Sequence, residues 1–149
     1  MSKDELRDYM RGYNQSYVVI AISGTFTAFL PFDIDPKQCV DVLKLKFDDI
    51  IVPVGRAQLF KLSHAKSILD FFYKYKNIPT LICQCEAGIS RSAAVCAALL
   101  KIDGLDNSHI FNSDRYFPNE LVYETMLKVA KIIDNRTKES NTPVTPLIF

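Results

Sequence analysis

Residues 80–102 read TLICQCEAGISRSAAVCAALLKI, and three kinds of sequence follow one another in this stretch. The first six residues form a short apolar run typical of a buried strand, and residues 92–102, rich in alanine and leucine, favour a helix. Between them, Gly88 and Ser90 stand among small residues that let the chain turn tightly. We therefore expect a strand, a tight turn and a helix, with Cys85 and Arg91 at the two ends of the turn.

The rest of the chain repeats this alternation of strand and helix. Apolar patterns predict strands at 17–23 and 40–47, a helix at 64–76 with Ser63 as its N-cap, and a last helix at 119–134 opened by Pro118. Alternating strands and helices are typical of a parallel sheet with helices covering its faces. The predicted fold class is therefore α/β, with a central, mostly parallel sheet flanked by helices.

Length and charge limit the class of protein. A chain of 149 residues, 48% of them hydrophobic, predicts one domain over 1–149, with residues 1–16 and 136–149 peripheral. The net charge of +1 creates no field that would attract nucleic acid or a membrane, so neither is expected as a partner. The polar N-terminus and the short apolar runs indicate a cytoplasmic protein. The pattern carries no signal for an oligomeric state.

The four cysteines do not form a metal or disulfide framework. Cys83 and Cys85 are separated by a single residue, and the two histidines, His64 and His109, lie far from them. No metal site and no cofactor are therefore expected. Cys83 and the other two cysteines are interpreted as packing residues, and His64 as a solvated surface residue.

The turn at 85–91 has the chemistry of an anion site. The first N–H groups of a helix lack partners within the helix, and the helix dipole adds partial positive charge there. A loop with Gly88 can direct successive N–H groups at one oxyanion, and Arg91 adds a fork suited to two phosphate oxygens. The same potential lowers the pKa of a thiol, so we expect Cys85 to be partly or largely a thiolate.

The sequence CEAGISRS resembles the C-x5-R-[S/T] loop of the cysteine-dependent protein tyrosine phosphatases, in their compact dual-specificity-like branch. The resemblance implies a phosphatase that acts on phosphotyrosine, and also on phosphoserine or phosphothreonine, in proteins through a phosphocysteine intermediate. It implies Cys85 as nucleophile, Arg91 as phosphoryl clamp and Ser92 as the group that eases departure of the thiolate. The implied phosphate cradle is the backbone of Glu86, Ala87, Gly88, Ile89, Ser90 and Arg91.

The resemblance also implies an aspartate as general acid, some thirty-odd residues before the cysteine. Asp49 lies 36 residues upstream of Cys85, after the strand predicted at 40–47. Parallel strands bring their carboxyl ends to one edge of the sheet, so Asp49 is expected to face the same crevice as Cys85. Asp48 is the rival, because adjacent side chains of an extended segment point to opposite sides.

Gln84 departs from the family pattern, which has a histidine before the nucleophile. That histidine helps to hold the thiolate, so its replacement predicts a higher pKa for Cys85 and a weaker enzyme. A catalytically weak or inactive phosphate-binding pseudophosphatase is therefore one alternative. A rhodanese-type sulfurtransferase is another, although its loops are usually shorter and need no upstream aspartate.

Overall fold

The computed structural model describes residues 1–2, 4–5, 8, 13–29, 35–136 and 147–148. The strands are β1 (Tyr17–Ser23), β2 (Cys39–Lys46), β3 (Thr80–Gln84) and β4 (Leu147–Ile148). The helices are α2 (Leu62–Lys74), α3 (Arg91–Ile102), α4 (Ser108–Phe111) and α5 (Glu120–Arg136). The α/β class and the predicted strands are therefore confirmed, with ends that shift by a residue at β2 and β3.

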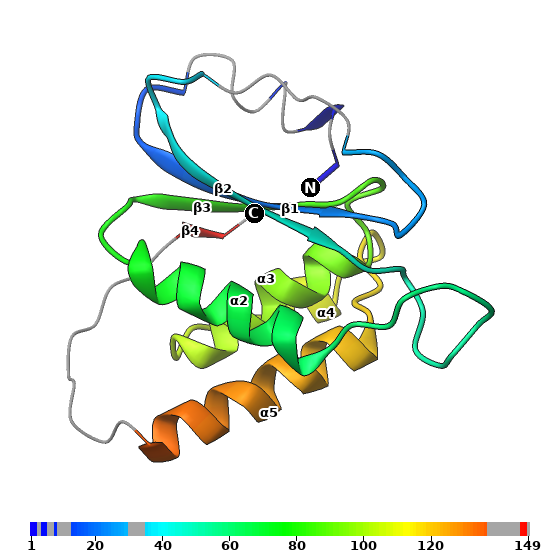
Figure 1. The fold of residues 1–149 in the computed structure, drawn as a ribbon. Helices are drawn as coiled ribbons and strands as arrows, with labels where there is room; N and C mark the ends of the chain where they lie inside the picture. Colours follow the sequence, from blue (N-terminus) through cyan, green and yellow to red (C-terminus); the bar gives the residue numbers. More distant parts are fainter. Residues whose placement is uncertain (3, 6–7, 9–12, 30–34, 137–146, 149) are drawn as a thin grey trace.

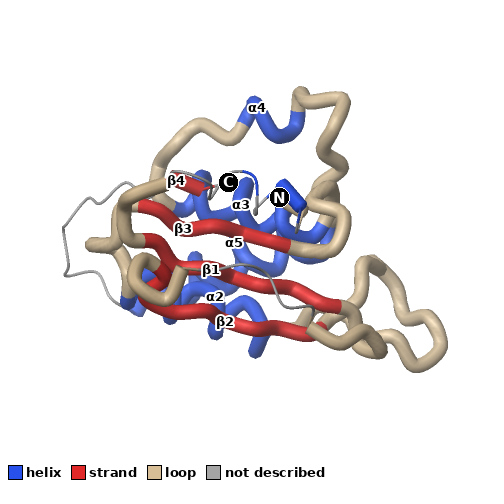
Figure 2. The backbone as a smooth tube through the Cα atoms, turned by 90° about the horizontal axis from the view of Figure 1, so that it is seen from above, coloured by secondary structure: helices blue, strands red, loops and turns tan. Residues whose placement is uncertain are grey.

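The four strands form one sheet in the order β2-β1-β3-β4, and every neighbouring pair is parallel. Figure 2 shows this order from above, with β1 and β3 in the middle. All residues of β1 are buried, as expected for a central parallel strand covered on both faces. Because the strands are parallel, the chain leaves β1, β2 and β3 at the same edge of the sheet.

The helices α2, α3 and α5 lie on one face of the sheet (Figure 1). Val18, Ile20 and Ile22 of β1 point to this face and belong to the main core. The alternate residues of β1 point to the other face, where a smaller cluster packs partly against Met1 and Tyr13. The sheet is therefore flanked by helices, as the sequence predicts, and the three long helices α2, α3 and α5 all lie on the same face. A strand with apolar side chains on both sides requires cover, but its sequence does not say what kind.

The start of α2 differs from the prediction. The N-cap is Lys61, whose backbone N–H donates to Nδ1 of His64 at 2.9 Å, so Ser63 lies within the first turn. The prediction of Ser63 as N-cap is wrong because the side chain of His64, not a serine hydroxyl, satisfies the backbone there. The ring of His64 packs against Phe47 and Phe60, and burial lowers its pKa. It is therefore not the solvated surface residue expected from the sequence.

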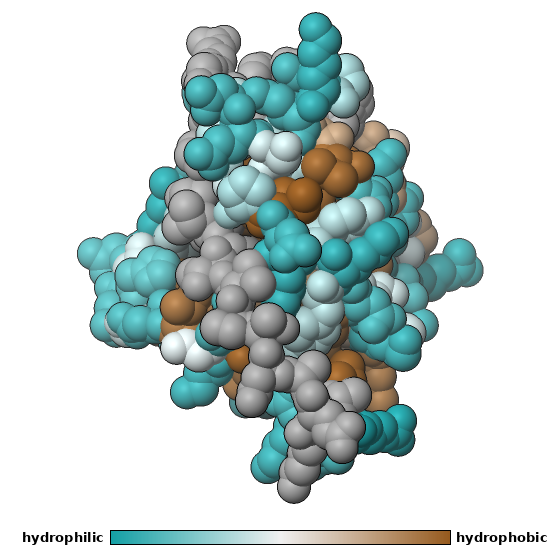
Figure 3. Space-filling view, turned by 90° about the vertical axis from the view of Figure 1, so that its left-hand side faces the viewer, coloured by the Kyte–Doolittle hydropathy of each residue, from teal (hydrophilic) through white to brown (hydrophobic). Residues whose placement is uncertain are grey.

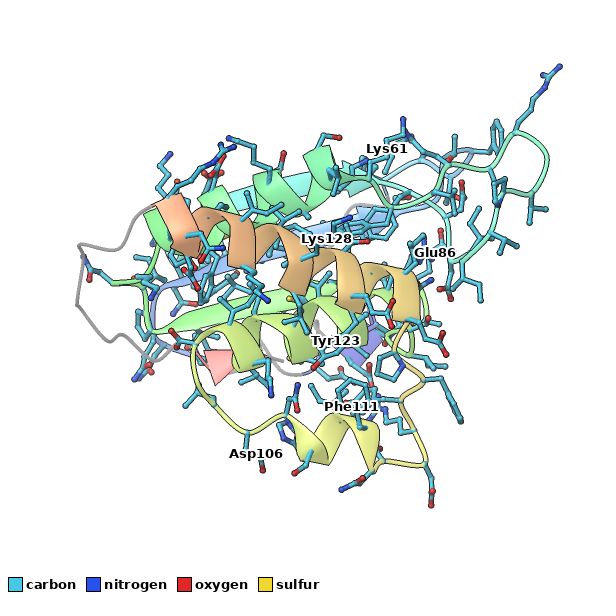
Figure 4. All side chains as sticks on the ribbon, turned by 90° about the horizontal axis from the view of Figure 1, so that it is seen from below. Lys61, Glu86, Asp106, Phe111, Tyr123 and Lys128 are labelled. Atoms are coloured by element: carbon cyan, nitrogen blue, oxygen red, sulfur yellow. The ribbon has the colours of Figure 1, made fainter. Side chains whose placement is uncertain are left out.

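The start of α5 also differs from the prediction. The helix begins at Glu120, and Oδ1 of the preceding residue, Asn119, accepts a hydrogen bond from the backbone N–H of Val122 at 3.1 Å. Asn119 thus caps the helix, and Pro118 lies just outside it. Near the start of α5, the short helix α4 packs on it through Phe111 and Tyr123, whose ring centroids are 5.0 Å apart (Figure 4).

The last described residues, Leu147–Ile148, add β4 to the sheet beside Thr80 and Leu81 of β3. Two residues of the tail at 136–149 thus pair with the sheet, and Phe149 and residues 137–146 lie outside the described residues. Within the described part of the chain, no helix has the length and apolar character needed to cross a bilayer.

Candidate active site

The turn between β3 and α3, here called the phosphate loop (residues 85–91), closes on its own cysteine. The backbone N–H of Gly88 donates to Sγ of Cys85 at 3.3 Å, and Sγ lies 3.2 Å from Oγ of Ser92. Gly88 has φ +69°, a conformation that favours glycine, so the tight turn depends on this residue. Only 2% of Cys85 is exposed. The loop thus places one sulfur at its floor, next to the first turn of α3.

The surroundings of Cys85 favour its thiolate. Burial opposes ionisation, but hydrogen bonds from the side chain and backbone of Ser92 and from the backbone of Gly88 outweigh it, so the pKa lies below its ordinary value. Burial raises the pKa of the other three thiols, that of Cys96 to about 12. The fold therefore prepares one of the four cysteines for nucleophilic chemistry and suppresses ionisation of the other three.

Gln84 occupies the position before the nucleophile and is buried. Its side-chain Nε2 donates to the carbonyl oxygen of Cys85 at 2.9 Å, so the amide holds the backbone of the loop. The lowered pKa agrees with the expectation that Cys85 is partly or largely a thiolate, and the bonds that lower it come from Ser92 and Gly88. The effect of glutamine in place of the family histidine stays a prediction.

Arg91 is 8% exposed and is held at two points. Its Nη1 donates to the carbonyl oxygen of Phe47 at 3.0 Å, which ties the phosphate loop to the chain leaving β2. Its Nη2 lies 3.8 Å from the carboxylate of Glu86. Glu86 lies at the end of the molecule from which the chain leaves the strands (Figure 4). The guanidinium thus connects the end of the predicted phosphate cradle to its first residue, Glu86, and to the chain after β2.

Asp49 meets the phosphate loop directly. Its Oδ1 accepts hydrogen bonds from Oγ of Ser90 at 2.7 Å and from Nδ2 of Asn119 at 2.9 Å. The carboxylate therefore lies at the rim of the loop that holds Cys85, as expected from the shared edge of the sheet. Both donors bond the same oxygen, and within the described residues no donor is bound to Oδ2.

Asp48, the neighbouring carboxylate, turns the other way. It accepts hydrogen bonds from the backbone N–H groups of Gln58 at 2.7 Å and Thr25 at 3.0 Å, and also from the hydroxyl of Thr25. Desolvation opposes its ionisation, but the bonds from Thr25 and Gln58 outweigh it and hold its pKa below the ordinary range. Asp48 thus ties the start of the loop at 48–61, here called the acid loop, to the chain that leaves β1.

Asn119 is a site residue that the sequence analysis missed. It is 5% exposed, its Nδ2 donates to Asp49 and to the carbonyl oxygen of Ile50, and its backbone N–H donates to the carbonyl oxygen of Ser90. The same side chain caps α5 through Val122. Asn119 therefore connects the acid loop, the phosphate loop and α5. Its position before an amphipathic helix was the available signal, but that signal indicates only a cap.

Two N-terminal residues lie against the phosphate loop. The backbone N–H of Cys85 donates to the carbonyl oxygen of Met1 at 3.2 Å. A Cβ atom at Gly88 would lie 2.3 Å from the backbone nitrogen of Ser2 and 2.5 Å from the carbonyl carbon of Met1. Gly88 is therefore required both for its backbone conformation and for this close approach, a contact for which the sequence has no pattern.

The chain matches no protein-family model and no curated protein. Solved structures do match it. A mouse putative dual specificity phosphatase complexed with zinc tungstate has a TM-score of 0.59 and 17% identity, with 91% of this chain and 82% of that chain covered. Human DUSP28 has a TM-score of 0.57 and 17% identity, with coverages of 88% and 87%.

PTPMT1 in complex with PI(5)P has a TM-score of 0.52 and 20% identity, with 81% of this chain and 80% of that chain covered. Matches at such identities establish the fold. The chain therefore has the fold of the cysteine-dependent protein tyrosine phosphatases, in its compact dual-specificity form.

Proposed function

We propose that this protein is a phosphatase that hydrolyses phosphotyrosine, and also phosphoserine or phosphothreonine, in proteins through a phosphocysteine intermediate. The observation that carries the proposal is the environment of Cys85: a thiol with a lowered pKa, bonded by Gly88 and Ser92 inside a loop that also holds Arg91. A sulfurtransferase has no use for Asp49 at the rim of that loop.

In the first step, the thiolate of Cys85 attacks phosphorus and the bond from phosphorus to the leaving oxygen breaks. Arg91 and the loop N–H groups stabilise the charge on the remaining phosphoryl oxygens. Asp49, protonated on Oδ2, gives its proton to the leaving phenolate or alkoxide. The bonds that Ser90 and Asn119 donate to Oδ1 hold the carboxyl group at the rim while it does so.

In the second step, water attacks the phosphorus of the phosphocysteine. Asp49, now ionised, takes a proton from this water, and the bond between sulfur and phosphorus breaks. The hydroxyl of Ser92, 3.2 Å from Sγ, donates a hydrogen bond to the departing thiolate. Inorganic phosphate leaves and Cys85 is again a thiolate, so protons and charges balance over the cycle.

Burial of the nucleophile supports phosphotyrosine as the main substrate. With 2% of Cys85 exposed, the phosphorus must reach the floor of the loop. In phosphotyrosine the phosphorus lies farther from the peptide backbone than in phosphoserine. A phosphotyrosine side chain can therefore reach a recessed thiolate while the peptide backbone stays farther from the phosphate loop.

The test is hydrolysis of para-nitrophenyl phosphate by the wild type and by Cys85→Ser across pH. We expect turnover by the wild type that is lost in Cys85→Ser, with an acid limb of kcat/KM below the ordinary pKa of a thiol, because the pKa of Cys85 is lowered. Cys96→Ser is the matched control and should keep turnover, because its thiol is un-ionised at neutral pH.

Two results would contradict the proposal. One is turnover that survives in Cys85→Ser. The other is absence of turnover at any pH in a protein that still binds vanadate or phosphate, which would indicate a phosphate-binding pseudophosphatase.

A further inference from the structure

Exposed apolar side chains gather around the candidate site. The chain leaves β1, β2 and β3 at this end of the molecule, and the acid loop projects beyond the sheet there (Figure 1). Among the described residues, the exposed large apolar side chains at this end are Phe26, Ile51, Val52, Val54, Ile89 and Phe117. The side facing away from the acid loop is mainly hydrophilic where it is coloured, with several apolar patches (Figure 3). A cluster of this kind on a protein surface marks a binding site more often than chance exposure.

A hollow of about 410 Å³ borders the site and includes three of these side chains, Ile51, Val52 and Val54, in its lining. Its lining combines residues of the acid loop, the phosphate loop and the start of α5: Asp49, Ile50, Ile51, Val52, Val54, Ser90, Pro118, Asn119 and Glu120. It shares Asp49 and Ser90 with the candidate active site. The proposed function assigns the phosphoryl group itself to Arg91 and the loop N–H groups, so the hollow is available to a neighbouring part of the substrate.

The charges of the hollow select what can occupy it. Its lining includes two carboxylates, Asp49 and Glu120, and no lysine or arginine. An acidic side chain or a multiply phosphorylated headgroup would be repelled there and would lose hydration without gaining a partner. An aliphatic or aromatic side chain would instead bury apolar surface against Ile51, Val52 and Val54.

We propose that this hollow, continuous with the candidate active site, binds an apolar side chain next to the phosphorylated residue of a protein substrate. The proposal rests on the proposed function and narrows its substrate class: phosphotyrosine flanked by a large apolar residue, with acidic flanks rejected. The acid loop thereby supplies both the general acid and the wall that selects the flank.

The test compares phosphotyrosine peptides with alanine flanks in which the position directly before or directly after phosphotyrosine is Leu or Glu. At one of these positions, kcat/KM for the Leu peptide should exceed that for the Glu peptide by about tenfold or more. Val52→Lys should reduce this ratio several-fold by accepting the Glu peptide. Val52 is 58% exposed, so this substitution leaves the core intact.

Ile132→Lys is the matched control. Ile132 is 44% exposed on α5 and lies roughly 18 Å along the helix from Glu120, so this variant should keep the wild-type ratio. A wild type that hydrolyses para-nitrophenyl phosphate through Cys85 yet treats the Leu and Glu peptides alike at both positions overturns the inference and leaves the proposed function standing. If Cys85-dependent turnover is absent with all substrates, the proposed function fails and the inference with it.

Vesicles containing a phosphoinositide test the alternative that the exposed apolar side chains around the hollow bind a lipid surface. Cys85-dependent phosphate release from these vesicles with a higher kcat/KM than for the Leu peptide, lowered by Val52→Asp, would support this alternative and overturn the peptide proposal. Release that is slower than from the Leu peptide agrees with it, because Asp49 and Glu120 repel an anionic headgroup.

Discussion

The two loops of the candidate site are held in different ways. The phosphate loop is enclosed between the buried strand β3 and the start of α3, and most of its sulfur contacts come from its own backbone and from the first turn of that helix. The acid loop is exposed from Ile51 through Arg56, and it is held by side-chain hydrogen bonds of Asp48, Asp49 and Asn119 and by the buried ring of Phe60 near its end.

The two loops are proposed to serve different steps: the phosphate loop binds phosphate, and the acid loop transfers a proton to the leaving group. The phosphate loop holds the groups proposed to bind the phosphoryl group. The acid loop holds Asp49, the proposed general acid, together with the apolar wall proposed to select the flanking side chain of the substrate. Changes in the first loop should therefore damage binding and chemistry together, and changes in the second should affect particular substrates or leaving groups.

The largest effect on activity should come from a substitution in the phosphate loop, at Arg91. Arg91→Ala removes the phosphoryl clamp and the bond to Phe47, so we expect a loss of about 10³ to 10⁵ in kcat/KM. Inorganic phosphate or vanadate should also bind more weakly, because the same group holds the ground state. Arg115→Ala, which removes an exposed arginine, is the control. Unchanged phosphate binding in Arg91→Ala would show that the backbone alone forms the cradle.

Asp49→Ala should remove the proposed general acid of the acid loop and leave phosphate binding by the phosphate loop unchanged. We expect turnover of a phenyl phosphate with a poor leaving group to fall by roughly two to four orders of magnitude, and much less with an activated leaving group. Phosphate affinity should stay near that of the wild type. The matched variant is Asp48→Ala: if it shows this dependence on leaving group and Asp49→Ala does not, the general acid is the neighbouring residue.

Asn119 allows the connection between the two loops to be separated from its role as a helix cap. Asn119→Ser keeps a capping oxygen but removes the amide that donates to Asp49, so activity should fall roughly tenfold to a hundredfold with little change in stability. Asn119→Ala should lose about 1 kcal/mol of stability in addition. The loss in Asn119→Ser should again be greater for poor leaving groups; equal losses for all substrates would mean that Asn119 does not act through Asp49.

The sequence predicted the elements that depend on local patterns. The strand at 17–23, the helix after Arg91 and the apolar stripe of α5 follow from runs and periodicities within a few residues. The sequence also predicted that Cys85 and Asp49 lie at the same edge of the sheet, because the chain leaves parallel strands at one edge. These predictions needed no knowledge of which distant side chains meet.

The predictions that were wrong or missing depend on which groups come into contact in the folded protein. Ser63 and Pro118 are reasonable residues at a helix start, but a cap is decided by which acceptor reaches the free N–H groups, and the acceptors are His64 and Asn119. The bonds that Asn119 donates to Asp49 and that the backbone N–H of Cys85 donates to Met1 join residues far apart in the sequence. The sequence predicted a lowered pKa for Cys85, but only the folded loop shows that hydrogen bonds from Ser92 and Gly88 outweigh the effect of burial.

The smallest effect tests how the acid loop is tied to the body of the protein. The folded-state pKa of Asp48 lies below its unfolded value, near 3.9, so its stabilising contribution is complete above that pH and is lost as the pH falls through the folded pKa. Asp48→Ala removes the bonds from Thr25 and Gln58 and should lower the free energy of unfolding by about 1 kcal/mol at neutral pH, a small value because solvent screens this partly exposed group.

The difference in unfolding free energy between wild type and Asp48→Ala should shrink in acid, where the wild-type carboxylate is protonated. Asp70→Ala, which removes a carboxylate from an exposed pair with Lys66, controls for the loss of charge and should change stability less. Denaturant unfolding from pH 3 to pH 7 measures both. A difference that is constant over this range would mean that the ionised form of Asp48 does not stabilise the folded protein.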